Sequence, residues 1–207
     1  MQQRFLIICF LVTLSCVFLH AGSNFNKHRP HRPRPDSEIE ERAATSFTTE
    51  QRQVQNQLLA DHNTYRAAHC APALKLDDTL SRSAQEYAEE LAKTNTFEHS
   101  TLTDLGENLF LMESSRPITD LIAATKQASK GWYAEKNKYD FDTAVFSEET
   151  GHLTQLLWWE TTHVGVGFAI RKDGSKYKMF LVAHYLPPGN VDGLFFDNVL
   201  PVECKFY

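Results

Sequence analysis

The sequence predicts an α+β fold in which helices cover an antiparallel sheet. Three stretches with helical periodicity come first, and two β-rich segments follow near the end of the chain. The Asp173-Gly174 pair between these segments is typical of a hairpin turn. Helices followed by a late hairpin favour segregated α+β architecture over alternating βαβ units. With 207 residues, 42% of them hydrophobic, the chain is large enough for one domain plus accessory segments.

Residues 1–23 have the order of a secretory signal peptide. Arg4 precedes an apolar run over residues 5–19, and the small residues Ala21, Gly22 and Ser23 follow. We expect cleavage after Ser23 and a secreted, extracellular product with no transmembrane span. The alternative is an uncleaved anchor, but the run is shorter than the roughly 20 residues that span a bilayer.

Cleavage would remove Cys9 and Cys16 and leave Cys70 and Cys204. Two cysteines on an oxidising secretory route favour one disulfide. The sequence leaves open whether the two sulfur atoms meet.

Residues 24–50 are expected to form a linker. Proline alternates with basic residues and histidine in its first half, and glutamates follow in its second half. Proline removes backbone donors and favours an extended chain, so this stretch cannot form a core element. One interpretation is a solvated, protease-sensitive tether. The other is a basic arm that binds an anionic surface, such as sulfated glycan or lipid headgroups, through Lys27, Arg29, Arg32 and Arg34.

The domain itself is predicted over residues 51–203, with a short tail at 204–207. From Thr49 onward, apolar residues follow a helical spacing that ends before Pro72, because proline restricts the residue preceding it. A short extended segment at 73–76 follows. Asp77 or Asp78 then caps a second helix with a strong apolar stripe. A third helix is expected from about Thr119 to about residue 139.

The stretch 151–158 is predicted to be a short buried helix. Leu153, Leu156 and Leu157 form one apolar stripe, and His152 falls in the first turn. A histidine there can face a cleft, or it can be a capping or packing residue. Trp158 and Trp132 are expected in the core. Exposure is expected for Trp159, which precedes a charged residue.

The hairpin strands are predicted at residues 164–170 and 177–185. Gly165 and Gly167 lie in the first of them. They lack the third glycine and the following helix of a nucleotide-binding turn. We therefore expect them to permit close packing against the strand.

Several short motifs occur in a fixed order and together resemble the CAP superfamily of cysteine-rich secretory, antigen 5 and plant pathogenesis-related proteins. The resemblance is strongest to the disulfide-poor branch of Golgi-associated plant-pathogenesis-related-like proteins. Two positions depart from the pattern: Leu153 replaces a usual aromatic residue, and Ala183 replaces a cysteine of many secreted members. The motifs are His62-Asn63-x-Tyr65-Arg66, Ala71-Pro72-x-Leu74, Ala84-Gln85-x-Tyr87-Ala88, Gly106-Glu107-Asn108-Leu109, Trp132-Tyr133-x-Glu135, Gly151-His152-x-Thr154-Gln155-x-x-Trp158, Val164-Gly165-Val166-Gly167 and Tyr185-x-Pro187-x-Gly189-Asn190.

The resemblance implies a three-layer α/β/α sandwich with an antiparallel central sheet and a large cleft. It implies that a tetrad of His99, Glu107, Glu135 and His152 lies in that cleft. Such residues can form a hydrogen-bonded network, act as acid and base, or bind Zn²⁺ through His99 and His152. Each also has a local alternative: Glu107 can brace its own turn, Glu135 can be solvated, and His99 can satisfy a nearby backbone group.

These observations lead to three functional hypotheses. The first is a secreted, non-enzymatic CAP protein that binds a lipid or sterol, a glycan or a protein through the cleft and apolar grooves. The second is a metal-assisted hydrolase or protease that uses the tetrad. No Gly-x-Ser-x-Gly or His-Glu-x-x-His motif supports it, so no residue is assigned as catalytic. The third is surface adhesion through the basic arm. A net charge of −5 gives no reason to expect nucleic-acid binding.

Overall fold

A computed structural model describes residues 46–204 of the chain. The predicted signal peptide at 1–23, most of the predicted linker and the basic arm residues Lys27, Arg29, Arg32 and Arg34 lie outside the described residues. The same is true of residues 205–207 in the predicted tail. Among the helices of the described part, none is long and apolar enough to cross a membrane.

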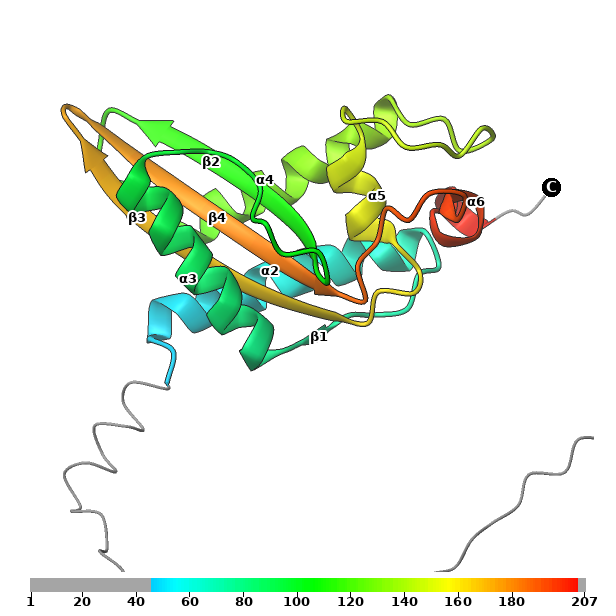
Figure 1. The fold of residues 1–207 in the computed structure, drawn as a ribbon, viewed down its shortest axis with the longest axis horizontal. Coiled ribbons are helices and arrows are strands. Elements are labelled where there is room, and N and C mark those ends of the chain that lie inside the picture. The colour runs from blue at the N-terminus through cyan, green and yellow to red at the C-terminus, as the bar shows by residue number, and fades with distance from the viewer. Residues whose placement is uncertain (1–45, 205–207) are drawn as a thin grey trace, which may run out of the picture. The chain divides into compact units, whose positions relative to one another are not determined.

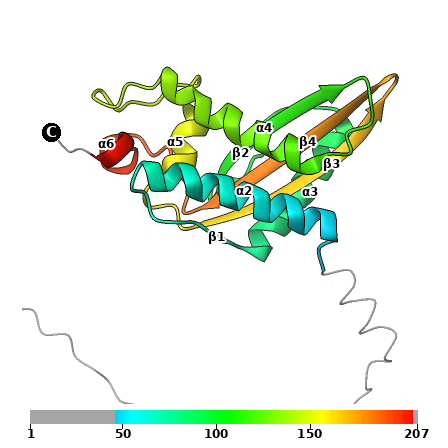
Figure 2. The ribbon, with the colours of Figure 1, turned by 180° about the vertical axis from the view of Figure 1, so that it is seen from behind.

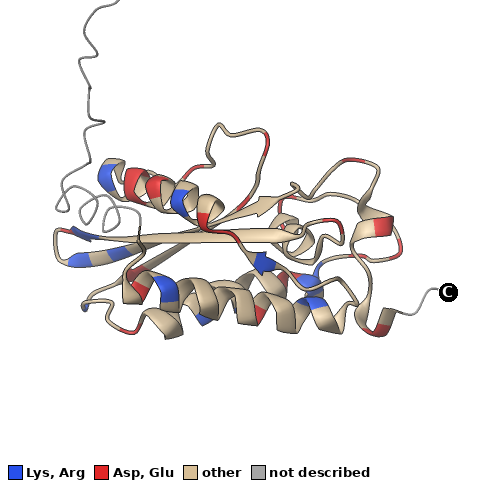
Figure 3. Ribbon diagram, turned by 90° about the horizontal axis from the view of Figure 1, so that it is seen from below, with Lys and Arg blue, Asp and Glu red and all other residues tan. Residues whose placement is uncertain are grey.

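A four-stranded sheet lies between two layers of helices (Figures 1 and 2). Figure 3 shows the sheet edge-on, with α3 on one side and α2 and α4 on the other. The helices are α2 (Thr49–Ala68), α3 (Asp78–Thr94), α4 (Leu121–Ala134), α5 (Gly151–Leu157) and α6 (Phe195–Asn198). The strands are β1 (Lys75–Leu76), β2 (Gly106–Ser114), β3 (His163–Asp173) and β4 (Lys176–Leu186), in the spatial order β1-β3-β4-β2. Two short 3₁₀ turns, η1 (Glu135–Asn137) and η2 (Val202–Cys204), complete the elements.

The predicted α/β/α sandwich is confirmed, but the sheet is mixed and not purely antiparallel. β1 runs parallel to β3, while the β3–β4 and β2–β4 pairs are antiparallel. The backbone N–H groups of Lys75 and Asp77 donate to Thr162 and Val164 on the neighbouring chain segment. Residue alternation identifies the two faces of a strand but carries no information on the direction of its neighbour. The parallel pair therefore could not be predicted from the alternation of residues.

Local sequence signals fix the helix ends. Thr48 and Gln51 form a reciprocal capping box, so α2 begins at Thr49, inside the stretch predicted as linker. Asp77 caps α3 by accepting from the N–H of Leu80 at 2.8 Å. The third helix is shorter than predicted, because α4 ends at Ala134 and the chain tightens into η1.

Gly165 and Gly167 let α3 lie directly against β3. A Cβ atom at Gly165 would overlap the backbone of Leu80 and Ser81, and one at Gly167 would overlap the backbone of Gln85. Side chains of α3 also complete the hydrogen bonding of β3, since Gln85 accepts from the N–H of Phe168 and donates to its carbonyl. The close packing expected from these glycines is confirmed.

The larger core lies between the sheet and the α2, α4 and α5 layer, and a smaller one lies under α3. As predicted, Trp132 and Trp158 are buried, whereas 39% of Trp159 is exposed. The His62–Tyr185 hydrogen bond of 2.8 Å joins α2 to β4 inside the core. Burial is the main reason that the pKa of His62 falls to about 3, so this ring is neutral at physiological pH.

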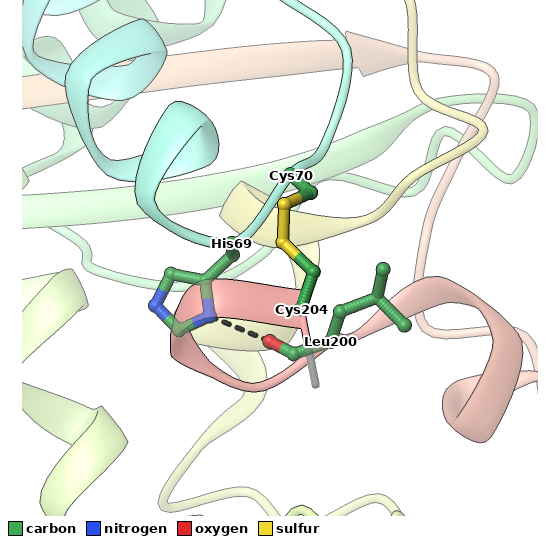
Figure 4. The surroundings of a disulfide bond; sticks show 4 residues. All are labelled: His69, Cys70, Leu200 and Cys204. Carbon is green, nitrogen blue, oxygen red and sulfur yellow. Dashed lines mark hydrogen bonds between the residues drawn. A yellow bond between two sulfur atoms is a disulfide. The ribbon is translucent and has the colours of Figure 1, made fainter. Parts of the chain in front are cut away.

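The C-terminal segment folds back onto the end of α2. A disulfide joins Cys70 to Cys204, and Nδ1 of His69 lies 2.5 Å from the carbonyl oxygen of Leu200 (Figure 4). Val199 and Leu200 are buried in this region. The segment after β4 is therefore part of the packed domain and not a loose tail.

Candidate functional site

A cavity of about 470 Å³ opens where β2, α5 and three loops meet. Strand β2 and helix α5 each contribute lining residues. The loop after α3, the loop at 140–150 and the segment after β4 contribute the others. The lining residues are His99, Glu107, Asn108, Phe146, Glu148, Gly151, His152 and Asn190.

His99 and Glu107 form the first half of the candidate site. Nδ1 of His99 donates to Glu107 Oε1 at 2.6 Å, and the N–H of Ser100 donates to the same oxygen at 3.0 Å. Glu107 lies on β2, and 8% of its side chain is exposed, whereas 64% of the His99 side chain is exposed. A buried carboxylate on a strand therefore holds an exposed imidazole on a loop.

Glu107 remains ionised despite its burial. Burial is the largest single influence and raises its pKa, but hydrogen bonds from His184, His99 and Ser100 outweigh it together and lower the pKa to about 2. The same hydrogen bond to Glu107 is the main cause that raises the pKa of His99 above its usual value. The first half of the site is therefore an ion pair at mildly acidic pH.

Replacing Glu107 with glutamine is expected to lower the free energy of unfolding by about 3 kcal/mol at neutral pH. A carboxylate with a depressed folded-state pKa stabilises the fold above its ordinary pKa of 4.5. That stabilisation is lost as the pH falls through about 2. Urea unfolding between pH 7 and pH 2 should show this acid dependence in the parent chain and a flatter profile in Glu107→Gln.

Glu148→Gln is the matched control for this prediction. Glu148 lines the same cavity, but its side chain is exposed and not buried like that of Glu107. We expect this variant to unfold like the parent. A Glu107→Gln profile parallel to the parent profile at every pH would contradict the assigned role of Glu107.

Glu135 and His152 form the second half of the site. Nδ1 of His152 donates to Glu135 Oε1 at 2.7 Å, and the N–H of Leu153 donates to Glu135 Oε2 at 3.0 Å. Glu135 starts η1 directly after α4, and His152 lies in the first turn of α5. Glu135 is not among the cavity-lining residues, so it supports His152 from outside the cavity wall.

His152 is held by contacts with several packed elements. Its ring stacks on the buried indole of Trp132, with centroids 6.1 Å apart. Asn108 donates to the carbonyl oxygen of His152 at 3.0 Å and to the hydroxyl oxygen of Tyr185 at 3.1 Å. The position of His152 is thus determined by α4, β2 and β4 at once.

His99 and His152 each present a ring nitrogen with the chemistry of a metal ligand. Both histidines use Nδ1 to bind a carboxylate, which leaves Nε2 with the lone pair when the ring is neutral. Among the described residues no hydrogen bond engages either Nε2 atom. A carboxylate behind a histidine is the usual support for a metal ligand. However, no group of three or more His, Cys, Asp or Glu residues in the described part is arranged to hold a metal ion.

Three of the four tetrad residues, His99, Glu107 and His152, line the cavity. Glu135, the fourth, does not line it and contacts His152 instead. Sequence reasoning missed other contributors. His184 contacts Glu107, and Phe146 and Glu148 line the cavity. The motif Gly106-Glu107-Asn108-Leu109 pointed to β2, but no periodic signal marks the loop at 140–150. The two cysteines of the predicted pair join the end of α2 to η2, and neither lines the cavity.

Comparison with known proteins identifies the family. The model of the CAP family, described as the cysteine-rich secretory protein family, matches residues 59–185. Golgi-associated plant pathogenesis-related protein 1 of Homo sapiens is 39% identical over 155 residues, which cover 72% of this chain and 94% of that protein. Other curated relatives are longer, and the match covers between 40% and 66% of their length.

Solved structures share the fold. BmVAL-1 is similar with a TM-score of 0.62 at 23% identity, over 77% of this chain and 87% of that one. NaASP2, solved with Zn²⁺, gives a TM-score of 0.57 at 24% identity, over 73% of this chain and 88% of that one. From the family match, the relative at 39% identity and the sandwich with its cleft, we conclude that this chain belongs to the CAP, or cysteine-rich secretory protein, family.

Proposed function

We propose that the chain is a secreted, non-enzymatic CAP protein whose cavity binds a partner with the help of a weakly held Zn²⁺ ion. The observation that carries this proposal is the pair of imidazoles that line one cavity, each backed by a carboxylate. His99 and His152 would supply one nitrogen each. Support comes from NaASP2, a protein of the same fold that has been solved with Zn²⁺.

Two protein ligands favour binding over hydrolysis. Catalytic zinc sites use three protein ligands and one water, and structural sites use four. A two-histidine site leaves coordination positions that water or a donor group of the partner can occupy. Glu107 and Glu135 are both engaged by a histidine and by a backbone N–H, so neither is arranged as a free general base.

The cavity mouth adds an apolar component to this recognition. Phe146 lines the cavity and is 51% exposed, and its neighbour Val145 is 61% exposed. On the other side Val191, next to the lining residue Asn190, is 44% exposed. We infer that the partner, whether a protein, a glycan or a lipid such as a sterol, combines a metal-ligating group with an apolar portion.

The secretory route is part of the same proposal. A disulfide between Cys70 and Cys204 is expected to persist in an oxidising compartment and not in the cytosol. The signal-like order of residues 1–23 agrees with this route. N-terminal sequencing of exported protein should begin at Asn24, and an intact Met1 would contradict the proposed cleavage.

Calorimetric titration of Zn²⁺ tests the cavity site directly. The full exported chain is used with His28→Ala and His31→Ala already in place, because the basic arm carries histidines that can bind zinc themselves. We expect binding near one equivalent that is lost when His99→Ala and His152→Ala are added. Affinity should also fall as the pH is lowered through the raised pKa of His99, because protonation of the ring competes with the metal.

His163→Ala is the matched control for the titration. His163 begins β3, contacts Thr162 and does not line the cavity. The control should bind zinc like the parent. Binding that survives in the His99/His152 double variant, or that disappears equally in His163→Ala, would refute the cavity site.

A further inference from the structure

His184 is a buried imidazole behind the first half of the site. It lies on β4 with none of its surface exposed, directly opposite Glu107 in the β2–β4 register. Its Nε2 atom is 3.1 Å from Glu107 Oε2, and its Nδ1 atom is 3.1 Å from the hydroxyl oxygen of Ser83 on α3. A buried polar ring is costly unless both nitrogens find partners, and here both do.

These contacts form one hydrogen-bonded chain from α3 to the cavity. Because ionised Glu107 only accepts, Nε2 of His184 carries the proton in this contact, and Nδ1 accepts from Ser83. The other oxygen of Glu107 then accepts from His99. His184 and His99 thus donate hydrogen bonds to opposite oxygens of the Glu107 carboxylate, and together these bonds fix its plane.

The two halves of the site differ in this respect. Glu135 is held on its second oxygen by a backbone N–H of α5, and His152 is fixed further by stacking on Trp132. His99 lies on a loop and its side chain is mostly exposed. Among the described residues, the side chain of His99 forms a hydrogen bond to Glu107 alone. The orientation of His99 therefore depends on how Glu107 is held.

We propose that His184 is a positioning residue: it fixes the orientation of Glu107 and thereby presents Nε2 of His99 to the cavity. The inference rests on the proposed zinc function where it concerns metal affinity, but it concerns the geometry of His99 in either case. It assigns a role to a residue outside the cleft tetrad. In physical terms, the exposed ligand is preorganised from the buried side of the sheet through a carboxylate.

A pair of substitutions separates the two contacts of His184. In His184→Gln, the amide N–H₂ group can reach the position of Nε2 and still donate to Glu107. In His184→Asn, the shorter amide falls near the position of Nδ1, so it can contact Ser83 but leaves Glu107 Oε2 without this donor. Both variants remove the ring, and His184→Asn leaves a gap that is larger by one methylene, so the free energy of unfolding is measured for each variant beside its zinc affinity.

Two measurements are made on each variant in the His28→Ala/His31→Ala background. The first is zinc affinity by calorimetry: we expect a loss of about tenfold or more for His184→Asn and little change for His184→Gln. The second is the ¹⁵N spectrum of the histidine rings without metal. We expect His99 to keep its Nδ1–H form in the parent and in His184→Gln. In His184→Asn it should shift toward the Nε2–H form that free histidine favours.

The two measurements keep the inference separate from the proposed function. If the parent chain binds no zinc in the cavity, the proposed function fails, and the spectrum of His99 still decides the role of His184. An unchanged His99 spectrum in His184→Asn would overturn the inference. The inference would also be overturned if both variants lost zinc affinity in proportion to their loss in free energy of unfolding. The altered packing alone would then explain the effect.

Discussion

Arg66→Met is expected to lower the free energy of unfolding by about 3–5 kcal/mol. Arg66 is fully buried in the body of the domain, and its guanidinium group binds backbone carbonyl oxygens. Nε donates to Pro72 at 2.7 Å, Nη1 donates to Leu156 and Trp158, and Nη2 donates to Thr161 at 2.9 Å. Methionine fills a similar volume but cannot donate, so Pro72, Leu156 and Thr161 lose these hydrogen bonds. The carbonyl oxygen of Trp158 keeps only the N–H of Thr161.

The arrangement explains why arginine is needed at this position. The acceptors lie on the loop before β1, at the carbonyl end of α5 and just before β3, so one planar fork holds three segments in register. Burial lowers the pKa of Arg66 to about 10, and the group remains charged at neutral pH. Arg66→Lys is also expected to be destabilising, because one ammonium group cannot reach all of these carbonyls.

Urea unfolding followed by tryptophan fluorescence measures the effect, and Arg52→Met is the control. Arg52 forms an ion pair with Asp78 at 2.8 Å on the surface, and its loss should cost less than about 1 kcal/mol. The transition midpoint of Arg66→Met should shift strongly while its slope stays unchanged. A cost no larger than that of Arg52→Met would show that the buried network does not stabilise the fold.

The double substitution Cys70→Ala/Cys204→Ala is expected to destabilise the domain by about 4–5 kcal/mol in the chain-entropy model. The disulfide closes a sequence separation of 134 residues, which spans nearly the whole domain. Its removal enlarges the conformational freedom of the unfolded chain. It also releases the C-terminal segment, which is then held mainly by buried Val199 and Leu200 and by the contact of His69 with Leu200.

Unfolding of the parent chain with and without reductant provides the internal control. Reduced parent and double variant should unfold at the same urea concentration, well below that of the oxidised parent. The oxidised and reduced intact masses establish which form is present. If the oxidised parent and the double variant unfold together, the bond does not constrain the unfolded chain as the entropy model requires.

The sequence by itself determined the local elements and the family. Helical periodicity from Thr49, a cap at Asp77 or Asp78, and Pro72 predicted where helices begin and end, because caps and proline act within a few residues of themselves. The structure adds the cap at Thr48 and selects Asp77 for the second helix. The Asp-Gly turn predicted the hairpin, and the structure places Gly174 there with a φ of 61°. The ordered motifs predicted CAP membership, which the family match shows.

Only the tertiary structure decided which polar residues act together. Glu107 and His184 are 77 positions apart and meet because β2 and β4 pair in one register. Glu148 lines the cavity from a loop whose sequence has neither helical nor strand periodicity, so no pattern predicted its place. The parallel β1–β3 pair and the carbonyl oxygens around Arg66 could not be predicted either, because they join residues that are far apart in the sequence. The local sequence pattern predicts which face of a helix or strand a residue occupies. Which residue it contacts on that face depends on the packing of elements that are distant in the sequence.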